Sequence, residues 1–402
     1  MCKLFTLLTL IVCTGYAADD PYSGYSLGQR YADKNPPEII KDNRPAGATE
    51  WPLWLQPPEI IKPDQSHYQS AETRKFEGIS SLAVSPSGRL WVTWYANSVA
   101  PAEDENNYAV LATSGDDGKT WEEILMIDPD GAGPIRGYDS TLWLSPDGRL
   151  WLFWGQKLKS KTEPSGVWAM NTNTPDVADP EWTAPVRLTD GVMLNKPTVL
   201  SNGTWLLPAA IWRTDNGARV VASTDNGKTF NVLGACNVLP VETRNCDEHM
   251  IIERKDGSLW MLVRTLYGIG ESVSTDKGRT WSKLTPAKFQ QPVSRFFIRR
   301  LNSGNLLLIK HGEIDKKIDA RSHLMAFISK DDGETWQGGF MIDERNGISY
   351  PDGQQAENGV IYITYDYNRW QDKKIFMACF TEQDVLAGKA VTDKVRLRVP
   401  VN

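Results

Sequence analysis

The sequence predicts an all-β protein, a six-bladed β-propeller, and three observations carry this prediction. A hairpin pattern, Ser-x-Asp-x-Gly-x-Thr followed by Trp or Phe, occurs four times in the 402 residues. A turn glycine followed by an apolar, aromatic-rich strand occurs six times. Both patterns repeat at about 55 residues, which is long enough for four short antiparallel strands, the content of one propeller blade.

The four hairpin copies begin at Ser114, Ser223, Ser274 and Ser329. In such a turn the Ser and Asp side chains bind backbone N–H groups, Gly takes a positive φ, and the aromatic ring packs beneath. The last three copies lie 51 and 55 residues apart, whereas the first two are 109 apart, which is about two blades. One blade, with residues 167–182 in the corresponding place, therefore lacks the pattern.

The turn glycines set the number of blades. They are spaced 60, 55, 54, 47 and 55 residues apart: Gly88, Gly148, Gly203, Gly257, Gly304 and Gly359. We expect the propeller to occupy residues 75–402, with one short helical turn near 382–386. Residues 18–74 are rich in Pro, Asp and Asn, which predicts an extended lead-in that wraps the propeller instead of forming a second domain.

Residues 1–17 have the pattern of an export signal. Lys3 supplies the positive start, residues 4–12 are a short apolar run, and residues 15–17 offer a cleavage site with small residues. The run is too short to span a membrane, and no later segment is a candidate span. We therefore expect a secreted or periplasmic protein. Cys13 follows a residue that fits a lipoprotein anchor site poorly, so we do not expect a lipid anchor.

Composition limits the partners of this chain. The formal net charge is −6 with both signs intermixed, so no basic stripe exists for nucleic acid. Beyond the signal, Cys236, Cys246 and Cys379 remain, and the first two could form a disulfide in an exported protein. The histidines and cysteines have no metal-site spacing, and we expect no cofactor. The sequence sets no oligomeric state.

With six blades and four such hairpins, the chain resembles the sialidase superfamily, in particular bacterial proteins with neuraminidase-type repeats. The resemblance covers nearly the whole of residues 75–402. In such propellers the hairpins lie on the outer rim, away from the catalytic funnel. They therefore imply the fold, and the activity has to be argued from other residues.

Four residues match the family's catalytic pattern. Glu248, then an Asp-Gly turn and a strand ending in Arg264, resembles the run in which the family's Glu assists a Tyr nucleophile and its Arg binds the substrate carboxylate. Arg321 precedes the strand into the fourth hairpin, as the family's last binding Arg does. Tyr350 stands where the family keeps its nucleophile.

The chemistry of these four residues is consistent without the family. A sugar with a carboxylate on its anomeric carbon repels an anionic nucleophile, whereas a Tyr hydroxyl that loses its proton to a nearby Glu as it attacks avoids that repulsion. Two Arg side chains can bind the carboxylate with bidentate, charge-assisted hydrogen bonds. We expect all four side chains to converge on one funnel.

The sequence also departs from the family. The family opens with an Arg-Ile-Pro-like motif whose Arg completes a triad, but the corresponding stretch, residues 76–82, has no Arg. The family's Asp acid has no clear match, and the loop before the first hairpin offers Glu103, Asp104 or Glu105 as the acid. We therefore expect an acidic sugar whose identity stays open: the missing Arg counts against sialic acid, and a different acidic sugar, such as a uronic acid, would fit the altered carboxylate site.

Further candidates stand near the inner strands. Arg321 and His323, two residues apart, are expected to share one face of a strand. His249 is a candidate acid or base, or a hydrogen-bonded loop residue. The other predicted substrate-binding residues precede or flank inner strands, and each could instead form a structural ion pair: Arg136, Asp139, Lys196 and Arg295.

Three functions follow from these residues. The first is a sialidase-like exo-glycosidase acting on an acidic terminal sugar of a glycan or polysaccharide, with Tyr350 as nucleophile and Glu248 as its base. The second is a uronate lyase or dehydratase in which His249, His323 or Tyr350 removes the C5 proton. The third is a propeller that binds glycans without catalysis.

Overall fold

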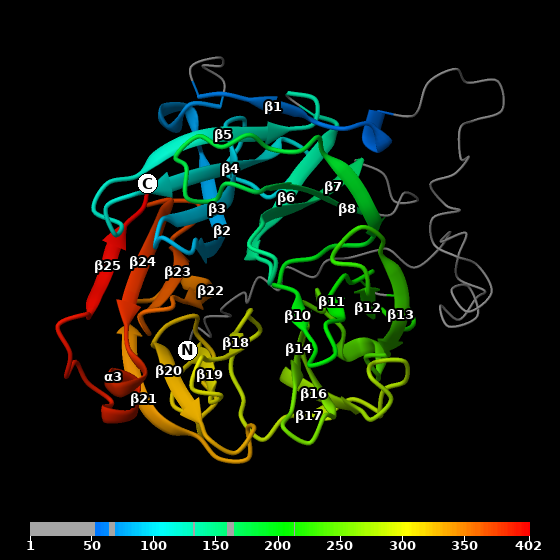
Figure 1. Cartoon of the computed structure of the whole chain (residues 1–402), viewed down its shortest axis with the longest axis vertical. Coiled ribbons are helices and arrows are strands. Elements are labelled where there is room, and N and C mark those ends of the chain that lie inside the picture. The colour runs from blue at the N-terminus through cyan, green and yellow to red at the C-terminus, as the bar shows by residue number, and fades with distance from the viewer. Residues whose placement is uncertain (1–52, 64–68, 132, 159–164, 213) are drawn as a thin grey trace, which may run out of the picture.

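A computed structural model of the chain describes residues 53–63, 69–131, 133–158, 165–212 and 214–402. In Figure 1 six sheets stand in a ring, so the predicted six-bladed β-propeller is confirmed. The expected export signal lies outside the described residues, as does most of the expected lead-in. No helix in the described part of the chain is long and apolar enough to cross a membrane.

Each blade is one sheet of antiparallel strands in chain order, running outward from the middle of the ring (Figure 1). Blades 1 to 3 consist of β2 (Phe76–Val84), β3 (Leu90–Asn97), β4 (Asn107–Ser114) and β5 (Glu122–Asp128); β6 (Ile135–Leu144), β7 (Leu150–Leu158), β8 (Gly166–Thr172) and β9 (Val186–Asp190); and β10 (Thr198–Val199), β11 (Trp205–Leu207), β12 (Ala218–Ser223) and β13 (Asn231–Cys236).

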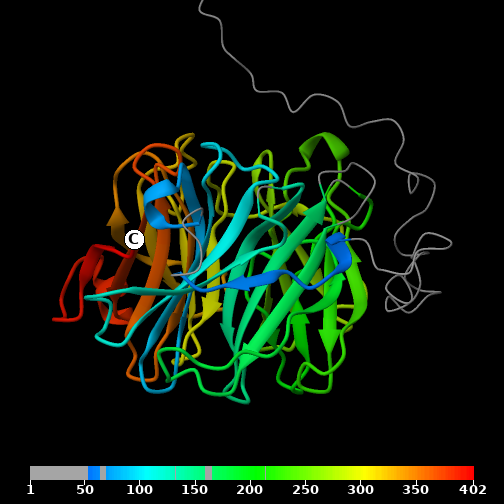
Figure 2. The ribbon, with the colours of Figure 1, turned by 90° about the horizontal axis from the view of Figure 1, so that it is seen from above.

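Blades 4 to 6 consist of β14 (Met250–Glu253), β15 (Leu259–Thr265), β16 (Gly268–Ser274) and β17 (Thr285–Pro286); β18 (Phe297–Arg300), β19 (Leu306–His311), β20 (Leu324–Ser329) and β21 (Gln337–Asp343); and β22 (Ile348–Gln355), β23 (Ile361–Tyr367), β24 (Lys374–Phe380) and β25 (Arg396–Pro400). An additional strand, β1 (Glu59–Ile61), pairs with β5 along the outer edge of blade 1 (Figure 2). The short 3-10 helices are η1 (Leu53–Leu55), η2 (Ala71–Thr73) and η3 (Val241–Thr243).

The hydrophobic core lies between neighbouring blades. Among the described residues, six clusters of buried apolar side chains each join two adjacent blades, and a seventh lies at the centre of the ring. Middle strands therefore pack on both faces. In β3, Trp91 packs toward blade 2 and Trp94 toward blade 6. Burying one such ring stabilises the fold by roughly 4–6 kcal/mol before conformational entropy is counted.

The ring closes by side-chain contacts between blades 6 and 1, without exchange of a strand. Asp352 of β22 accepts hydrogen bonds from Ser81 Oγ (2.6 Å) and Leu82 N (3.0 Å) of β2. The C-terminal Asn402 donates to Glu77 Oε2 (2.8 Å) at the start of the same strand. Blade 1 is therefore held at two places along its inner strand β2.

The predicted turns form as expected. Ser329 Oγ donates to Asp331 (2.8 Å), Gly333 N donates to Ser329 Oγ (2.8 Å) and Thr335 N donates to Asp331 (2.9 Å). The other three hairpins repeat these contacts. At Gly88 φ is +92° and a Cβ would meet no atom within 4 Å, so this glycine serves the backbone conformation and not close packing.

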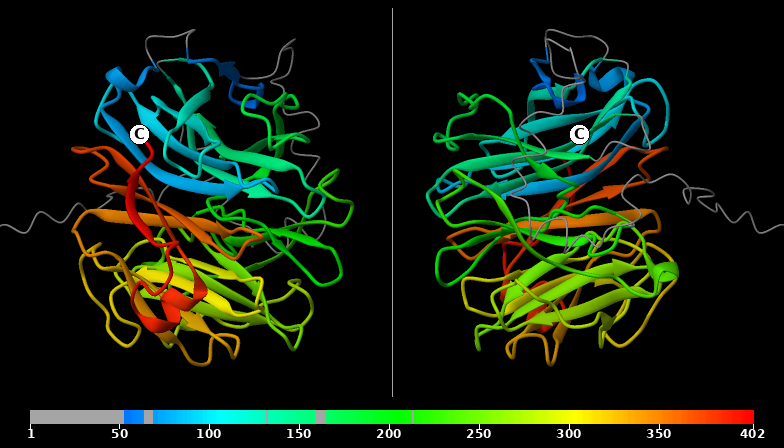
Figure 3. Two further views of the ribbon diagram at one scale, coloured as in Figure 1. Left: turned by 60° about the vertical axis from the view of Figure 1, so that its left-hand side comes forward. Right: turned by 90° about the vertical axis from the view of Figure 1, so that its right-hand side faces the viewer.

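Two blades lack the hairpin. Blade 2 is the one expected from residues 167–182, between β8 and β9. In blade 6 a helix, α3 (Glu382–Ala387), stands in its place and confirms the predicted helical turn. Figure 3 shows α3 beside blade 5, where Val385 joins the cluster that contains Phe340 of β21. The disulfide that the sequence allowed between Cys236 and Cys246 is not formed, since Cys236, Cys246 and Cys379 form no disulfide.

Candidate functional site

The candidate site lies at the end of the ring opposite the hairpins. In every blade the first strand ends at the turn glycine and the third ends at the hairpin or its counterpart, because neighbouring strands are antiparallel. The opposite end collects the starts of the first strands and the loops after the second strands. Glu248 directly precedes β14, Tyr350 is near the start of β22, and Arg264 is near the end of β15.

Irregular backbone at the inner strands brings side chains together at this end. Ile79, Asp139 and Tyr350 occupy left-handed conformations with φ of 56°, 50° and 55°. Each lies in a β-bulge at the same point of its blade, and Glu248 has a φ of 40° at the matching place in blade 4. A bulge redirects a side chain, and strained backbone of this kind is concentrated at functional sites.

Tyr350, Glu248 and Arg264 form a closed triangle. The Tyr350 hydroxyl donates to Glu248 Oε1 at 3.2 Å, and Arg264 Nη1 donates to Glu248 Oε1 at 2.6 Å and to the Tyr350 hydroxyl at 3.1 Å. All three side chains are buried. Glu248 Oε2 and Arg264 Nε are buried and have no hydrogen-bond partner among the described residues, so the triangle retains unused polar capacity.

The electrostatics of the triangle keep the phenol neutral. Burial and, next, the negative charge of Glu248 raise the pKa of Tyr350 well above its ordinary value. Burial opposes the charge of Arg264, but the Glu248 carboxylate outweighs it and raises the pKa of Arg264. The arrangement is a neutral hydroxyl whose proton points at a carboxylate, with a permanent cation holding both oxygens.

Two more arginines gather on the same tyrosine. The guanidinium of Arg369, from the loop between β23 and β24, lies 5.1 Å from the centre of the Tyr350 ring, and that of Arg321 lies 5.7 Å from it. Arg321 donates to the carbonyl of Val293 (2.9 Å) and forms no ion pair with any described residue. Cations of blades 4, 5 and 6 therefore surround Tyr350.

The loop after β3 contributes one carboxylate to the site, and it is Glu103. It accepts from the Tyr95 hydroxyl (2.9 Å), pairs with Arg369 (2.8 Å) and lies 3.7 Å from Arg136. Although desolvation opposes ionisation, Arg369 and Arg136 lower the pKa of Glu103. Asp104, a predicted acid, instead accepts from Asn97 and Asn106 and shapes the loop.

Glu105, the other predicted acid, packs its Cγ about 3.1 Å from the position a Cβ would take at Gly133. This contact is with the turn before β6. Glu103 therefore takes the position in the site that the sequence left open among three neighbours.

Asp139 is the third carboxyl group that faces the site, after Glu248 and Glu103. It is 5% exposed and forms no hydrogen bond with the described residues. Burial raises the pKa of Asp139 to about 7; Arg136 and Arg295 lower it, whereas Glu248 and Glu103 raise it. Asp139 is thus the carboxyl of this site that can hold a proton near neutral pH.

Arg136 lies beside Asp139 at the start of β6. Its guanidinium stacks 4.2 Å from the Tyr138 ring and 5.3 Å from the Tyr95 ring, and its Nε donates to Asn107 (2.7 Å). The desolvated Arg136 keeps a raised pKa because Tyr95, Glu103 and Asp139 surround it. It remains a positively charged wall of the site.

Lys196 and Arg295, predicted to bind substrate, are used differently. Lys196 Nζ binds Asp352 (2.7 Å) and the carbonyls of Leu82 (2.8 Å) and Leu142 (2.6 Å). Arg295 pairs with the other oxygen of Asp352 (2.9 Å). Both side chains are buried in this network, which ties the inner strands together beneath the site, and Arg295 Nη1 has no hydrogen-bond partner among the described residues.

Of the two predicted histidines, His249 takes the second of its two expected roles, that of a hydrogen-bonded residue, and His323 differs from expectation. His249 is fully buried, its Nε2 contacts the carbonyl of Arg219 (2.7 Å), and burial lowers its pKa to about 4. The prediction that Arg321 and His323 share one face of a strand is wrong, because β20 begins only at Leu324 and His323 has a φ of 49°. His323 is exposed and contacts Ser322.

Tyr95 and Arg369 are the residues that sequence reasoning undervalued. Tyr95 lies in an aromatic strand that reads as packing, and Arg369 lies in a loop with no family counterpart. The sequence signal for Arg369 was the polar run of Asp366, Asn368 and Arg369 at the end of β23. The loop after β23 follows the second strand of its blade and therefore lies at the site end of the ring.

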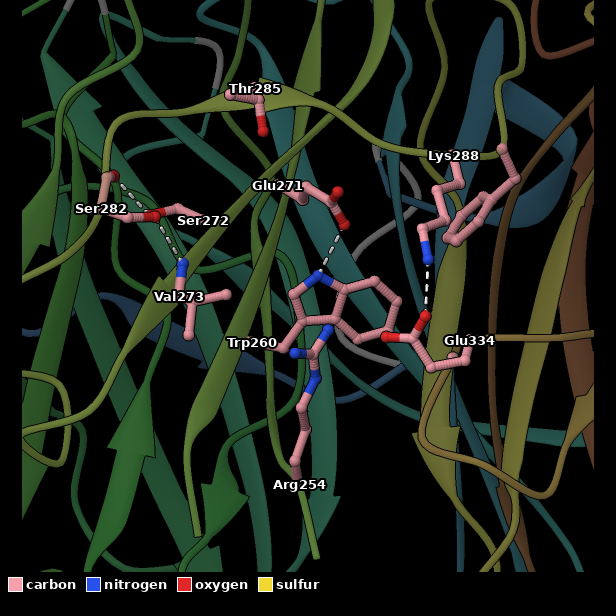
Figure 4. Close-up of a pocket in the computed structure, with 11 residues that line it drawn as sticks. Arg254, Trp260, Glu271, Ser272, Val273, Ser282, Thr285, Lys288 and Glu334 are labelled. Atoms are coloured by element: carbon pink, nitrogen blue, oxygen red, sulfur yellow. Dashed lines mark hydrogen bonds and ion pairs between the residues drawn. The ribbon is translucent and has the colours of Figure 1, made fainter. Parts of the chain in front are cut away.

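A cavity of about 220 Å³ lies elsewhere, between blades 4 and 5 at the hairpin end (Figure 4). The Trp260 indole donates to Glu271 (2.9 Å), and the Arg254 guanidinium lies 4.7 Å from its ring. With its ring face and N–H already occupied, Trp260 offers no stacking surface to a sugar. In the described part of the chain, no group of three or more His, Cys, Asp or Glu residues could hold a metal ion.

Comparisons with known proteins agree with this architecture. The family model for the BNR repeat-like domain matches residues 138–363. A curated relative, a sialidase of Clostridium perfringens, is 27% identical over 220 residues, which is 46% of this chain and 55% of the relative. The chain thus spans about half the length of the curated relative it matches.

Solved sialidase structures share the fold. A Hadza microbial sialidase superposes with a TM-score of 0.62 at 16% identity, over 78% of this chain and 67% of that one. The intramolecular trans-sialidase from Ruminococcus gnavus superposes with a TM-score of 0.62 at 14% identity, over 82% of this chain and 98% of that one. At this identity the similarity concerns the propeller alone.

Proposed function

Because the chain belongs to the BNR repeat-like domain family, we propose that it is a glycoside hydrolase that removes an acidic sugar from the end of a glycan or polysaccharide. The observation that carries the proposal is the triangle of Tyr350, Glu248 and Arg264, with a neutral phenol donating its proton to a buried carboxylate. Export by residues 1–17 remains part of the proposal.

In this proposal Tyr350 is the nucleophile. As its oxygen forms a bond to the anomeric carbon, its proton moves along the existing hydrogen bond to Glu248. Arg264 holds the phenol oxygen and the carboxylate together and stabilises the negative charge that develops on the phenol. The bond to the leaving oxygen breaks at the same stage.

Asp139 is the general acid in this proposal. It protonates the leaving oxygen, and in the second half it removes a proton from the water that releases the sugar from Tyr350. Its pKa of about 7, raised by burial, suits both roles. Glu103 suits the role less, because its ion pairs with Arg369 and Arg136 favour the ionised form.

The substrate class follows from charge. Arg264, Arg321, Arg369 and Arg136 face this site, whereas Glu248, Glu103 and Asp139 are the carboxyl groups of the described residues that face it. Arg321 has no anionic partner among the described residues, so a substrate carboxylate can form a charge-assisted pair with it. An anionic sugar would balance this excess of positive charge.

Elimination from a uronic acid is the second candidate, and the site favours it less. His249 is sealed from solvent and its pKa is lowered to about 4, so it is poorly placed to remove a C5 proton. Tyr350 could act as that base, with Glu248 receiving its proton. A glycan-binding propeller without catalysis is the third candidate, and the strained bulges at the site argue for catalysis.

The test is a screen of the purified full chain against oligosaccharides ending in sialic or uronic acids. We expect new reducing ends with no gain in ultraviolet absorbance; unsaturated products that absorb would instead establish elimination. Tyr350→Phe and Glu248→Gln should each reduce turnover about 100-fold or more. Tyr362→Phe, a blade 6 tyrosine bonded to Asp117 (2.8 Å) at the hairpin end, should retain it.

A further inference from the structure

Arg369 reaches the site because blade 1 has a glycine at position 78. A Cβ built on Gly78 would stand 2.3 Å from Cδ and 2.5 Å from Cγ of Arg369. Those distances are far inside van der Waals contact, and the atoms belong to the middle of the side chain. Any residue larger than glycine at position 78 therefore requires Arg369 to take another path.

Gly78 has no conformational reason to be a glycine. Its φ is not in the left-handed region, whereas the next residue, Ile79, takes that conformation at 56°. Gly78 pairs with Tyr95 in the ladder between β2 and β3, a place where a side chain ordinarily fits. The absent side chain makes room for Arg369, whose Cδ and Cγ lie closest, and next for the Asp366 carboxylate, at 3.2 Å from the position of the added Cβ.

The guanidinium that passes over Gly78 is held firmly. Arg369 is 6% exposed and pairs with Glu103 (2.8 Å), and its Nε lies 3.9 Å from Asp366. The Trp370 ring lies 4.5 Å from its guanidinium carbon on one side and the Tyr350 ring 5.1 Å on the other. A side chain clamped in this way presents its charge at a fixed place.

We propose that Gly78 and Arg369 form one functional unit, in which blade 6 supplies a substrate-binding cation through the space that blade 1 leaves empty. This inference rests on the proposed function, since it assigns Arg369 to the carboxylate of the acidic sugar. Arg264, Arg321 and Arg369 then form a three-arginine clamp drawn from blades 4, 5 and 6. Blade 1 contributes the space left by the missing side chain of Gly78.

The arrangement sets the position of the bound sugar. Arg369 approaches Tyr350 over β2, while Arg264 lies on the side of β15. A carboxylate shared by Arg369 and Arg321 would lie close to Tyr350, since both guanidinium groups are within 6 Å of its ring centre. Arg369 is in this sense a residue that determines specificity for anionic substrates, and Gly78 is a positioning residue.

The test is a double-mutant cycle on the full chain with free N-acetylneuraminic acid and free glucuronic acid as probes, measured by titration calorimetry. We expect Arg369→Gln and Gly78→Ala each to weaken binding of the bound acid about 10- to 100-fold, as loss of a charge-assisted pair does. In the Arg369→Gln background, Gly78→Ala should cost nothing further. Arg369→Lys should retain part of the binding.

Gly115→Ala is the matched control. Its Cβ would meet the Arg89 guanidinium at 2.9 Å, so it displaces an arginine of the same blade at the hairpin end, and binding should not change. Equal and additive losses from Gly78→Ala and Arg369→Gln would overturn the coupling, and unchanged binding in Arg369→Gln would overturn the clamp. If Tyr350→Phe abolishes turnover while Arg369→Gln keeps it, only this inference fails; a wild type that binds neither acid overturns both.

Discussion

Replacement of Asp139 by Asn should make the protein more stable and less active at once. Asp139 is a buried carboxyl with no hydrogen bond to the described residues, in a strained backbone position with a φ of 50°. Asn has nearly the same shape and carries no charge, so it removes the cost of ionising this group. The same change removes the acid that the proposed reaction needs.

The size of the stability change follows from the pKa. Burial raises the pKa of Asp139 from 3.8 to about 7. At about 1.4 kcal/mol for each tenfold change in proton affinity, ionising it in the folded protein costs roughly 4 kcal/mol more than in the unfolded chain. Because the folded pKa is the higher one, stability is lost as the pH rises from about 4 through about 7.

The measurement is chemical denaturation of wild type and Asp139→Asn at about pH 5 and about pH 8. The advantage of the variant in free energy of unfolding should increase by roughly 2–3 kcal/mol between the two, since the wild type ionises over this range. Arg136, Glu248, Glu103 and Arg295 act on Asp139 and are common to both proteins, so the difference isolates the one carboxyl.

Activity supplies the second reading of the same variant. Turnover should fall about 100-fold or more if Asp139 is the acid. Asp128→Asn makes the same chemical change in β5, where Asp128 is bonded to Gln69 (2.9 Å) outside the site, and should leave turnover unchanged. A pH-independent stability difference would refute the burial argument. A fully active Asp139→Asn would refute the catalytic role and return attention to Glu103.

Three other predictions concern the framework. Lys196→Met should lower the free energy of unfolding by about 3 kcal/mol because Asp352 loses a buried partner. Lys288→Met removes an exposed ion pair and should change that free energy by less than about 1 kcal/mol. Denaturant titration measures both. Thr381→Ala should cost about 1 kcal/mol by removing the capping box of α3, with turnover unchanged in the same assay used above. Gly304→Ala should cost roughly 1 kcal/mol through backbone strain alone, since its φ is +84° and no atom lies within 4 Å of the new Cβ; a thermal melt checks this.

The architecture was readable from the sequence because it repeats. The turn at Gly304 requires a positive φ in every blade, and the hairpin at Ser329 requires the same four side chains wherever it occurs. Local chemistry therefore marked each blade independently of the others. The short helix near Glu382 was readable for the same reason, since Thr381 and Asp384 form its capping box within four residues.

Site residues could be predicted from the sequence only where the residue type seldom has a structural role instead. Tyr350, Glu248 and Arg264 do meet, but Lys196 and Arg295 looked equally suited and are buried in an ion network instead. A buried charge needs a partner whether it binds substrate or holds strands together. From sequence alone the partner is unknown, so the two uses cannot be told apart.

His249 shows why a histidine beside a site residue could not be assigned from sequence. Glu248 and His249 are adjacent just before β14, where the backbone is irregular, since Glu248 has a φ of 40°. Glu248 contacts Tyr350 and Arg264, whereas the His249 ring meets the carbonyl of Arg219 and is fully buried. Of the two roles that the sequence left open for His249, the structure shows the hydrogen-bonded residue.

Arg369 could not have been found from its own neighbourhood, because its place depends on Gly78 at the other end of the propeller sequence. Taken position by position, the missing arginine of blade 1 counts against sialic acid. In the closed ring, Arg369 of blade 6 packs against Gly78 of blade 1, and three guanidinium groups still surround Tyr350. Since the strands of a propeller meet at one axis, what the substrate meets is the set of charges at the centre and not the blade each comes from. The missing arginine is therefore a weaker argument against sialic acid, and the titration with N-acetylneuraminic and glucuronic acids decides between the two substrates.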